Sequence, residues 1–219
     1  MFSSSKMKQL NVSLLLVLVT CCPISFSYPN GAPISTCETM KPGHVGVYPQ
    51  PKPAPYIMKI NSSSYQSGKP IQVQILGPPY RGILLQTRTF AKTTLYGTWL
   101  EPPKDTKILP CPGNTVGSIT HANTNLKNQS TTYIWMPPNS SCPYVLFFVA
   151  TVAESFNVYW LGVRSAIIYR DPTTTCSMDK NTGKSGLFLD SSGMAWEPAL
   201  YLFMCLQLVL FLVEWPLLL

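Results

Sequence analysis

The stretch Tyr144-Val-Leu-Phe-Phe-Val-Ala-Thr-Val-Ala153, followed by Glu-Ser and then Phe156-Asn-Val-Tyr-Trp-Leu-Gly-Val163, decides the fold of this chain. The first ten residues are almost uninterruptedly apolar and rich in β-branched and aromatic types, but they are too short to span a bilayer. They therefore predict a strand that is buried on both faces. The polar pair at 154–155 predicts a turn into a second strand, in which positions 156, 158 and 160 share one face and 157, 159 and 161 share the other. We expect this hairpin to be central, with the other strands packed around it.

Turn residues divide the rest of the chain into short strand candidates. The segment Ile71-Gln-Val-Gln-Ile75 shows the clearest alternation, which directs Ile71, Val73 and Ile75 toward the core. The other candidates are 56–60, 83–90, 97–101, 118–121, 131–136 and 166–169. Five prolines between 42 and 55 predict an exposed, partly polyproline-like lead-in. Eight or nine strands without an amphipathic helix predict an all-β protein, an antiparallel β-sandwich.

Both ends of the chain have the character of targeting or anchoring segments. Residues 1–27 combine an early basic pair, an apolar run and the small-residue exit Ser25-Phe-Ser27, which predicts a signal peptide cleaved before Tyr28. The apolar run is short for an uncleaved signal anchor, and Pro23 interrupts it. We expect one domain at 28–176, because about 165 residues between the two ends suit a single core.

The C-terminal segment predicts attachment to a membrane. Residues 199–213 are apolar apart from Gln207, and no basic residue follows the apolar run. Ser191, Ser192 and Gly193 supply the small residues of a glycolipid-anchor signal, with 194–198 as a short spacer. A single-pass transmembrane helix is the alternative. We expect a linker at 177–198, a hydrophobic tail at 199–219 and a lipid anchor at Ser191 or Ser192.

Charge suggests an anionic partner but does not locate its site. Residues 28–193 carry 14 basic and seven acidic residues, a formal charge of +7, which can attract anionic polysaccharide or a bacterial surface. The basic residues are scattered, so an ordinary solvated surface is the alternative, and we expect no nucleic-acid partner. The candidate ligand face consists of residues without an obvious structural role: Tyr80, Arg81, Arg88, Lys104 and Lys107. Tyr80 could stack on a sugar or pack within its own turn.

Cysteines and glycan acceptors are typical of an exported protein. An even number of cysteines lies in the exported segment, which predicts two disulfides among Cys37, Cys111, Cys142 and Cys176. Spacing alone leaves all three pairings open. Acceptor sequences at Asn61, Asn128 and Asn139 predict three N-linked glycans, and hence three surface positions.

No pattern predicts catalysis or a bound cofactor. The two histidines, His44 and His121, lie outside the apolar tail, so a membrane haem would lack its ligands. A metal site built from both histidines with Glu38 or Asp105 is disfavoured, because their spacing does not arrange ligands. The chain has no Gly-x-Ser-x-Gly motif and no recognisable carboxylate pair. We therefore assign no catalytic, cofactor-binding or metal-binding residue.

An ordered set of motifs resembles the reelin domain, also called the reeler domain. The set comprises Tyr28-Pro-Asn-Gly31, Cys37 with Met40, Pro42 and His44, Gly77-Pro-Pro-Tyr-Arg-Gly82 before Leu84-Leu-Gln-Thr-Arg88, Trp135 before Pro137, and Val149-Ala-Thr-Val152 before Tyr159-Trp160. The resemblance covers approximately 28–176. It implies an immunoglobulin-like sandwich in which Cys37 pairs with Cys111 and Cys142 pairs with Cys176.

The resemblance also bears on function. The opening motif and the Gly-Pro-Pro turn are most similar to the N-terminal domain of ferric-chelate reductase 1-like membrane proteins, which continue into a DOMON domain and a haem-bearing module. This sequence stops before either, so reductase activity is not carried over. We expect a non-enzymatic recognition or adhesion protein, secreted or held at the cell surface, whose partner is an unidentified protein or an anionic glycan. The alternatives are an innate-defence protein that binds microbial polysaccharide and a truncated relative of the reductases.

Overall fold

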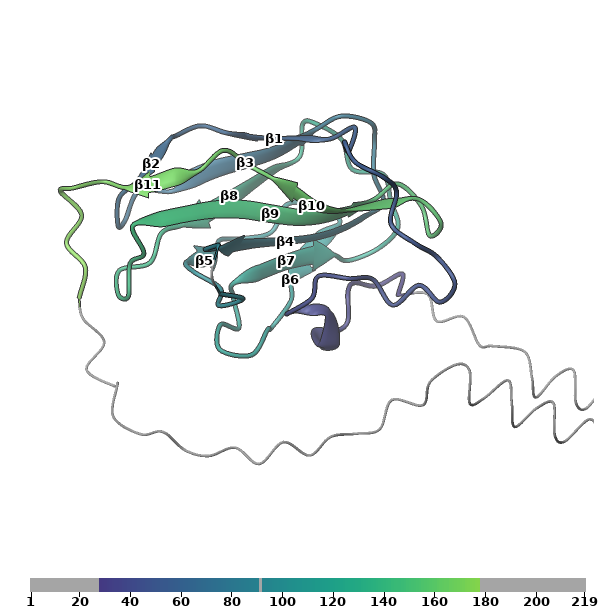
Figure 1. Ribbon diagram of the computed structural model, residues 1–219, viewed down its shortest axis with the longest axis horizontal. Coiled ribbons are helices and arrows are strands. Elements are labelled where there is room, and N and C mark those ends of the chain that lie inside the picture. Colours follow the sequence, from purple (N-terminus) through teal and green to yellow (C-terminus); the bar gives the residue numbers. More distant parts are fainter. Residues whose placement is uncertain (1–27, 91, 178–219) are drawn as a thin grey trace, which may run out of the picture. The chain divides into compact units, whose positions relative to one another are not determined.

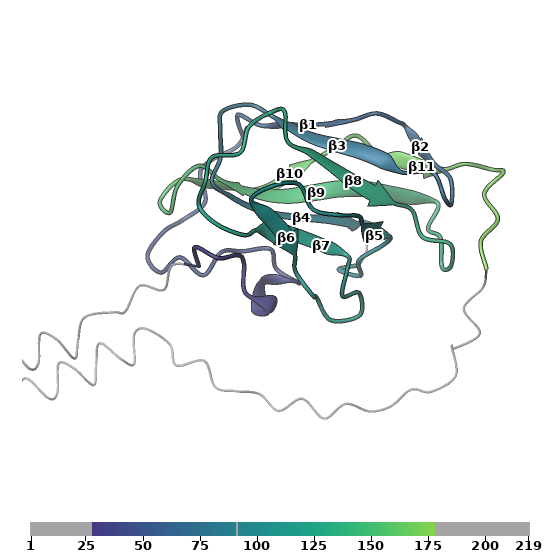
Figure 2. The same cartoon turned by 180° about the vertical axis from the view of Figure 1, so that it is seen from behind.

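The computed structural model describes residues 28–90 and 92–177, and these form an all-β domain. Within them, eleven strands build two sheets, and one 3₁₀ turn, η1 (Ile34–Thr36), is the only helical element. Figure 1 and Figure 2 show the sheets stacked, with β1 and β3 on one side of β9 and β4. The all-β sandwich prediction is confirmed. The predicted signal peptide, the hydrophobic tail and all but the first residue of the predicted linker lie outside the described residues.

The smaller sheet is entirely antiparallel. Its order is β1 (Ile57–Ile60), β3 (Ile71–Leu76), β8 (Thr132–Met136) and β5 (Thr98–Trp99). The alternation expected in β3 is confirmed, because Ile71, Val73 and Ile75 are at most 2% exposed, whereas Gln72 is exposed. This face meets the larger sheet in the main core.

The larger sheet has seven strands. Its order is β2 (Ser64–Tyr65), β11 (Ile168–Arg170), β9 (Val145–Ala153), β4 (Gly82–Arg88), β7 (Ser118–His121) and β6 (Thr106–Ile108), and β10 (Tyr159–Arg164) also pairs with β9. The pairing of β11 with β2 is parallel, so the sandwich is not wholly antiparallel. The sequence reasoning missed β2 and β6 because strands of two or three residues are too short to show a period. Lys107, which lies in none of the predicted strands, is therefore found on β6.

The central strand β9 is buried on both faces, as its composition predicts. Leu146, Phe148, Ala150 and Val152 enter the core between the sheets. Phe147 and Val149 point the other way, into a second apolar cluster that contains Cys37 and Met40 from the start of the domain. The outer face of the larger sheet is therefore covered by the N-terminal segment, which Figure 1 draws in purple on that side.

The hairpin differs from its sequence prediction in two respects. The turn spans 154–158 rather than two residues, because β10 begins at Tyr159, which pairs with Ala153. Phe156 consequently lies in the loop and stacks on His44, with 4.2 Å between the ring centroids. The register shifts between Trp160 and Val163, where Gly162 adopts a φ of 66°. An extra residue in one strand breaks strict alternation, so the buried side chains of Tyr159 and Val163 reach different faces: Val163 enters the main core, whereas the Tyr159 ring meets His44.

Candidate functional site

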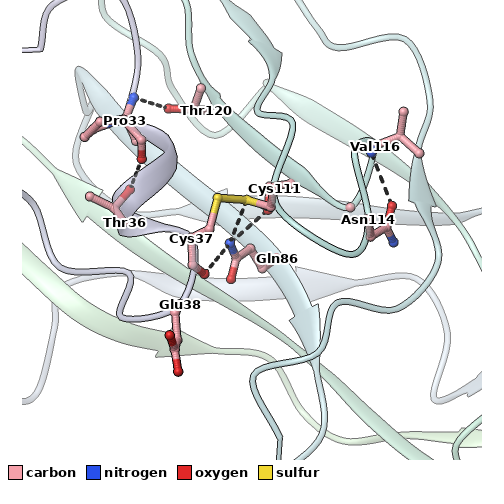
Figure 3. Close-up of a disulfide and its surroundings, with 12 residues drawn as sticks. Pro33, Thr36, Cys37, Glu38, Gln86, Cys111, Asn114, Val116 and Thr120 are labelled. Carbon is pink, nitrogen blue, oxygen red and sulfur yellow. Dashed lines mark hydrogen bonds between the residues drawn. A yellow bond between two sulfur atoms is a disulfide. The ribbon is translucent and has the colours of Figure 1, made fainter. Parts of the chain in front are cut away.

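Residues 28–44, here called the strap, are fastened to the outer face of the larger sheet by a disulfide. Cys37 is joined to Cys111, 74 residues further along the chain. Beneath it lies the buried Gln86 of β4, whose amide group donates to the Cys37 carbonyl oxygen at 3.1 Å and to Ser118 Oγ at 2.8 Å. Figure 3 shows this amide directed at the disulfide and Glu38 directed away from it. The strap is thus crosslinked over a satisfied polar network.

Three further hydrogen bonds fasten the strap along its length. The Ala32 N–H donates to Thr120 Oγ1 at 2.9 Å, and Thr151 Oγ1 donates to the Met40 carbonyl oxygen at 2.6 Å. At the strap's beginning, His121 Nε2 lies 2.9 Å from the Tyr28 carbonyl oxygen. Both halves of the strap are therefore tied to β7 and β9, the strands that also shape the surface beneath it.

Two residues of the predicted ligand face are engaged in contacts within the domain. Tyr80 is 0% exposed, its hydroxyl lies 2.9 Å from that of Tyr133, and burial raises its pKa to about 12. Arg88 donates to Gln86 Oε1 at 2.8 Å and to the carbonyl oxygens of Cys37 and Glu38. An enclosed phenol cannot stack on a sugar, and a guanidinium engaged in holding the strap has few donors left for a ligand.

The other three predicted residues are exposed. Arg81 gives one donor to the Thr124 carbonyl oxygen at 2.9 Å. Lys107 lies against the strap, because a Cβ added at Gly31 would be 2.7 Å from Lys107 Cε. Lys104 lies in the preceding loop, beside Asp105. The structure thus brings Arg81 and Lys107 to the region of the strap, while Lys104 lies just before β6.

A cavity of about 150 Å³ lies between the strap and the sheet. Most of its lining is apolar and includes Pro33, Met40, Ile83, Leu84 and Phe156. Polar groups are contributed by Arg81, by the histidines His44 and His121, and by hydroxyl side chains. No acidic side chain appears in the lining. The hydroxyl residues are Tyr28, Thr36, Thr124, Thr151 and Ser155. The cavity joins segments around positions 30–44, 81–84, 121–124 and 151–156. Sequence reasoning did not find it, since no local pattern signals that these segments meet.

Burial lowers the pKa of both histidines in this lining. For His44 burial is the largest cause. For His121 burial again dominates, its hydrogen bonds to the Tyr28 and Ile83 carbonyl groups oppose it, and the charges of Lys127 and Lys107 lower the pKa further. These positive charges are close enough to act on the His121 ring, so this side of the cavity has a positive potential.

Lys127 is a buried cation that sequence reasoning missed. Its side chain is 2% exposed, and Nζ donates to the carbonyl oxygens of Arg81, Asn123 and Asn125 at 2.9, 3.2 and 2.9 Å. Burial lowers its pKa, while the Asp105 carboxylate opposes this effect. The ammonium group therefore fixes the backbone on which Arg81 is placed. A single lysine between Leu126 and Asn128 carries no sequence signal for such a role.

The remaining predicted sites are distributed over the domain. The second disulfide joins Cys142 to Cys176, so both pairings implied by the resemblance are present. The glycan acceptors Asn61, Asn128 and Asn139 are all exposed. In the described part of the chain, no three His, Cys, Asp or Glu side chains gather in a way that could hold a metal ion. Across residues 28–90 and 92–177, no helix has the length and apolar character needed to cross a membrane.

Comparison with known proteins relates the chain to a single domain type. Residues 35–175 match the family described as Reeler domain. "Putative defense protein 3" of Antheraea mylitta is 34% identical over 156 residues, which cover 69% of this chain and 92% of that protein. "Ferric-chelate reductase 1" of Mus musculus is 28% identical over 163 residues, covering 73% of this chain and 27% of that protein. The crystal structure of the human F-spondin reeler domain matches with a TM-score of 0.47 and 10% identity, over 58% of this chain and 96% of that one.

Proposed function

Because the chain belongs to the Reeler domain family, we propose that it is an exported, non-enzymatic recognition protein that binds anionic polysaccharide, such as that of a microbial surface. The observation that carries the proposal is the placement of Arg81 and Lys107. Arg81 precedes Gly82, where an added Cβ would be 3.8 Å from the His121 ring, and the charge of Lys107 acts on the same ring. Two exposed cations thus flank one end of the strap.

The similar proteins support recognition rather than reduction. The match to the defense protein spans nearly all of that protein, whereas the match to the mouse reductase spans about a quarter of it. The reductase activity belongs to a protein that is mostly outside the match. Recognition by exposed side chains on a rigid sandwich needs no reacting group, and loops beside a fixed frame are suited to it.

Binding to immobilised lipopolysaccharide, measured by surface plasmon resonance, tests the proposal. We expect the affinity to fall as salt is raised, since screening weakens attraction between exposed charges. Arg81→Ala and Lys107→Ala should each weaken binding severalfold. Lys59→Ala removes an exposed charge from β1 of the smaller sheet and should leave the affinity unchanged. Binding that is independent of salt, or equally sensitive to Lys59→Ala, would count against a site at the strap.

A further inference from the structure

We propose that the cavity under the strap binds the apolar end of a small amphipathic carboxylate, with the carboxylate paired to Arg81. The proposal rests on the proposed function, because it assigns a ligand class to the same cationic side of the domain. It goes further in naming a partly open cavity as the binding site. The expected ligand carries an apolar group about the size of one six-membered ring, joined by a short linker to its anionic group.

The size of the cavity sets the size of the apolar group. Protein interiors contain few voids larger than a water molecule, so about 150 Å³ of space is more than close packing leaves. An apolar cavity of about this volume is known to hold one benzene molecule. Sites that enclose a whole drug-sized ligand are larger, from about 300 Å³ upward. The cavity therefore suits one end of a ligand, whose remainder lies outside.

The lining sets the chemistry of the enclosed end. Met40, Ile83, Leu84 and Phe156 present hydrocarbon, sulfur and ring surface, with prolines of the strap completing the wall. The nearby polar groups are largely occupied by the protein itself. Thr151 Oγ1 donates to Met40, and both nitrogens of His121 lie near main-chain carbonyl groups, whereas His44 Nδ1 is buried without a hydrogen-bond partner. A polar group inside would have few partners, and so an apolar group is favoured there.

Charge sets the chemistry of the other end. Arg81 is the one residue in the lining with a permanent charge, and its guanidinium has five N–H donors, of which one engages Thr124. Lys107 and Lys127 add positive potential, while the lining contributes no carboxylate. A guanidinium can bind a carboxylate through two parallel hydrogen bonds. An anion beside Arg81 is thus attracted without competition from an acidic residue of the lining.

The site is preformed rather than assembled around a ligand. The Cys37–Cys111 disulfide, Gln86 and Thr151 hold the strap over the sheet, and Lys127 holds the Arg81 backbone. Both walls of the cavity and its cation are therefore positioned by contacts that do not involve a ligand. Preorganisation of this kind reduces the entropy lost on binding.

Titration of the exported full-length protein with 3-phenylpropionate, followed by NMR and calorimetry, tests the proposal. We expect binding with intermolecular NOEs from the probe's ring to the Met40 and Ile83 methyl groups. The neutral amide of the probe should bind roughly tenfold more weakly, because it loses its charge-assisted hydrogen bonds. Propionate, which lacks the ring, should not bind measurably. Arg81→Met should weaken binding of the acid by about the same factor as replacing the acid with the amide does in the wild-type protein. The same substitution should leave the affinity for the amide unchanged.

Ala32→Leu, on the strap side of the cavity, should abolish binding by filling the space, and Lys59→Met is the matched surface control. If Ala32→Leu does not fold, the wild-type NOEs decide the location on their own. Absence of binding, NOEs to other residues, or equal affinities for acid and amide would each overturn the proposal. If the protein binds lipopolysaccharide in a salt-sensitive way but does not bind the probe, only the proposal of a cavity ligand is refuted. Probe binding without lipopolysaccharide binding would refute the proposed polysaccharide function alone.

Discussion

Among single residues, Lys127 shows how one buried charge organises a loop. Its ammonium group donates to three main-chain carbonyl groups, those of Arg81, Asn123 and Asn125. Lys127→Met approximately keeps the side-chain length but leaves these acceptors without their donor. We expect the free energy of unfolding to fall by about 1–3 kcal/mol. Denaturant titration measures the change, and Lys59→Met on the exposed side of β1 should alter it by less than about 0.5 kcal/mol. Similar losses in both variants would contradict the role given to Lys127.

His121 makes the stability of the domain depend on pH. Burial lowers its pKa from the ordinary value of 6.5, and Lys127 and Lys107 lower it further, although its hydrogen bonds oppose this. The unfolded chain therefore binds more protons than the folded chain in the range between the folded pKa and 6.5. Stability is complete above 6.5 and is lost as the pH falls through this range. The shift at His44 has the same sign.

We expect the Tm to fall between about pH 7.5 and pH 5, and to fall less in His121→Gln. Differential scanning calorimetry at both pH values provides the measurement. Asp105 and Asp171 do not confuse the result, because their pKa values are lowered from 3.8 by hydrogen bonds, and their contributions are lost only at lower pH. A Tm that stays constant or rises on acidification would show that the histidines are not held in their neutral form.

Among elements, the strap depends on one of the two disulfides. The bridges close loops with sequence separations of 74 and 34, and removing either should cost roughly 4 kcal/mol by the chain-entropy relation. Only Cys37–Cys111 fastens the strap, however. In Cys37→Ser/Cys111→Ser we expect residues 32–40 to lose hydrogen-exchange protection and the cavity to lose its ligand.

The matched control is Cys142→Ser/Cys176→Ser. Cys142 and Cys176 belong to the main core and its edge, away from the cluster that contains Cys37 and Met40. This variant should be destabilised to a similar degree while residues 32–40 keep their protection. Hydrogen exchange read by mass spectrometry separates the two outcomes. Equal loss of protection in both double variants would show that the strap is held by global stability rather than by its own crosslink.

For the whole molecule, membrane attachment stays a prediction from the sequence. Ser191 and Ser192, the predicted lipid-anchor sites, and the apolar tail lie outside the described residues. We expect a phosphatidylinositol-specific phospholipase to release the protein from the surface of expressing cells, because small residues, a short spacer and an apolar tail form a glycolipid signal. Flow cytometry and immunoblotting of the medium measure release. Retention of the protein with its tail intact would instead indicate a spanning helix.

The sequence by itself determined the fold class, the central strand and the inward face of β3. These follow from local rules, since side chains alternate along a strand and an unbroken apolar run must be covered on both faces. Composition also indicated two disulfides, although the pairing came from the family resemblance. The ends and irregularities of the strands were less predictable. The five-residue hairpin loop and the extra residue near Gly162 depend on backbone geometry, which hydrophobic period does not report.

Tertiary structure alone decided the site. Tyr80 and Arg88 are residue types that often bind ligands. The fold, however, buries Tyr80 beside Tyr133 and directs Arg88 to the strap. The cavity joins positions as far apart in the sequence as Tyr28 and Phe156, which strand pairing and the Cys37–Cys111 bridge bring together. The physical reason is that alternation is a property of neighbours along the chain, whereas an enclosed space is defined by segments whose proximity no local pattern encodes.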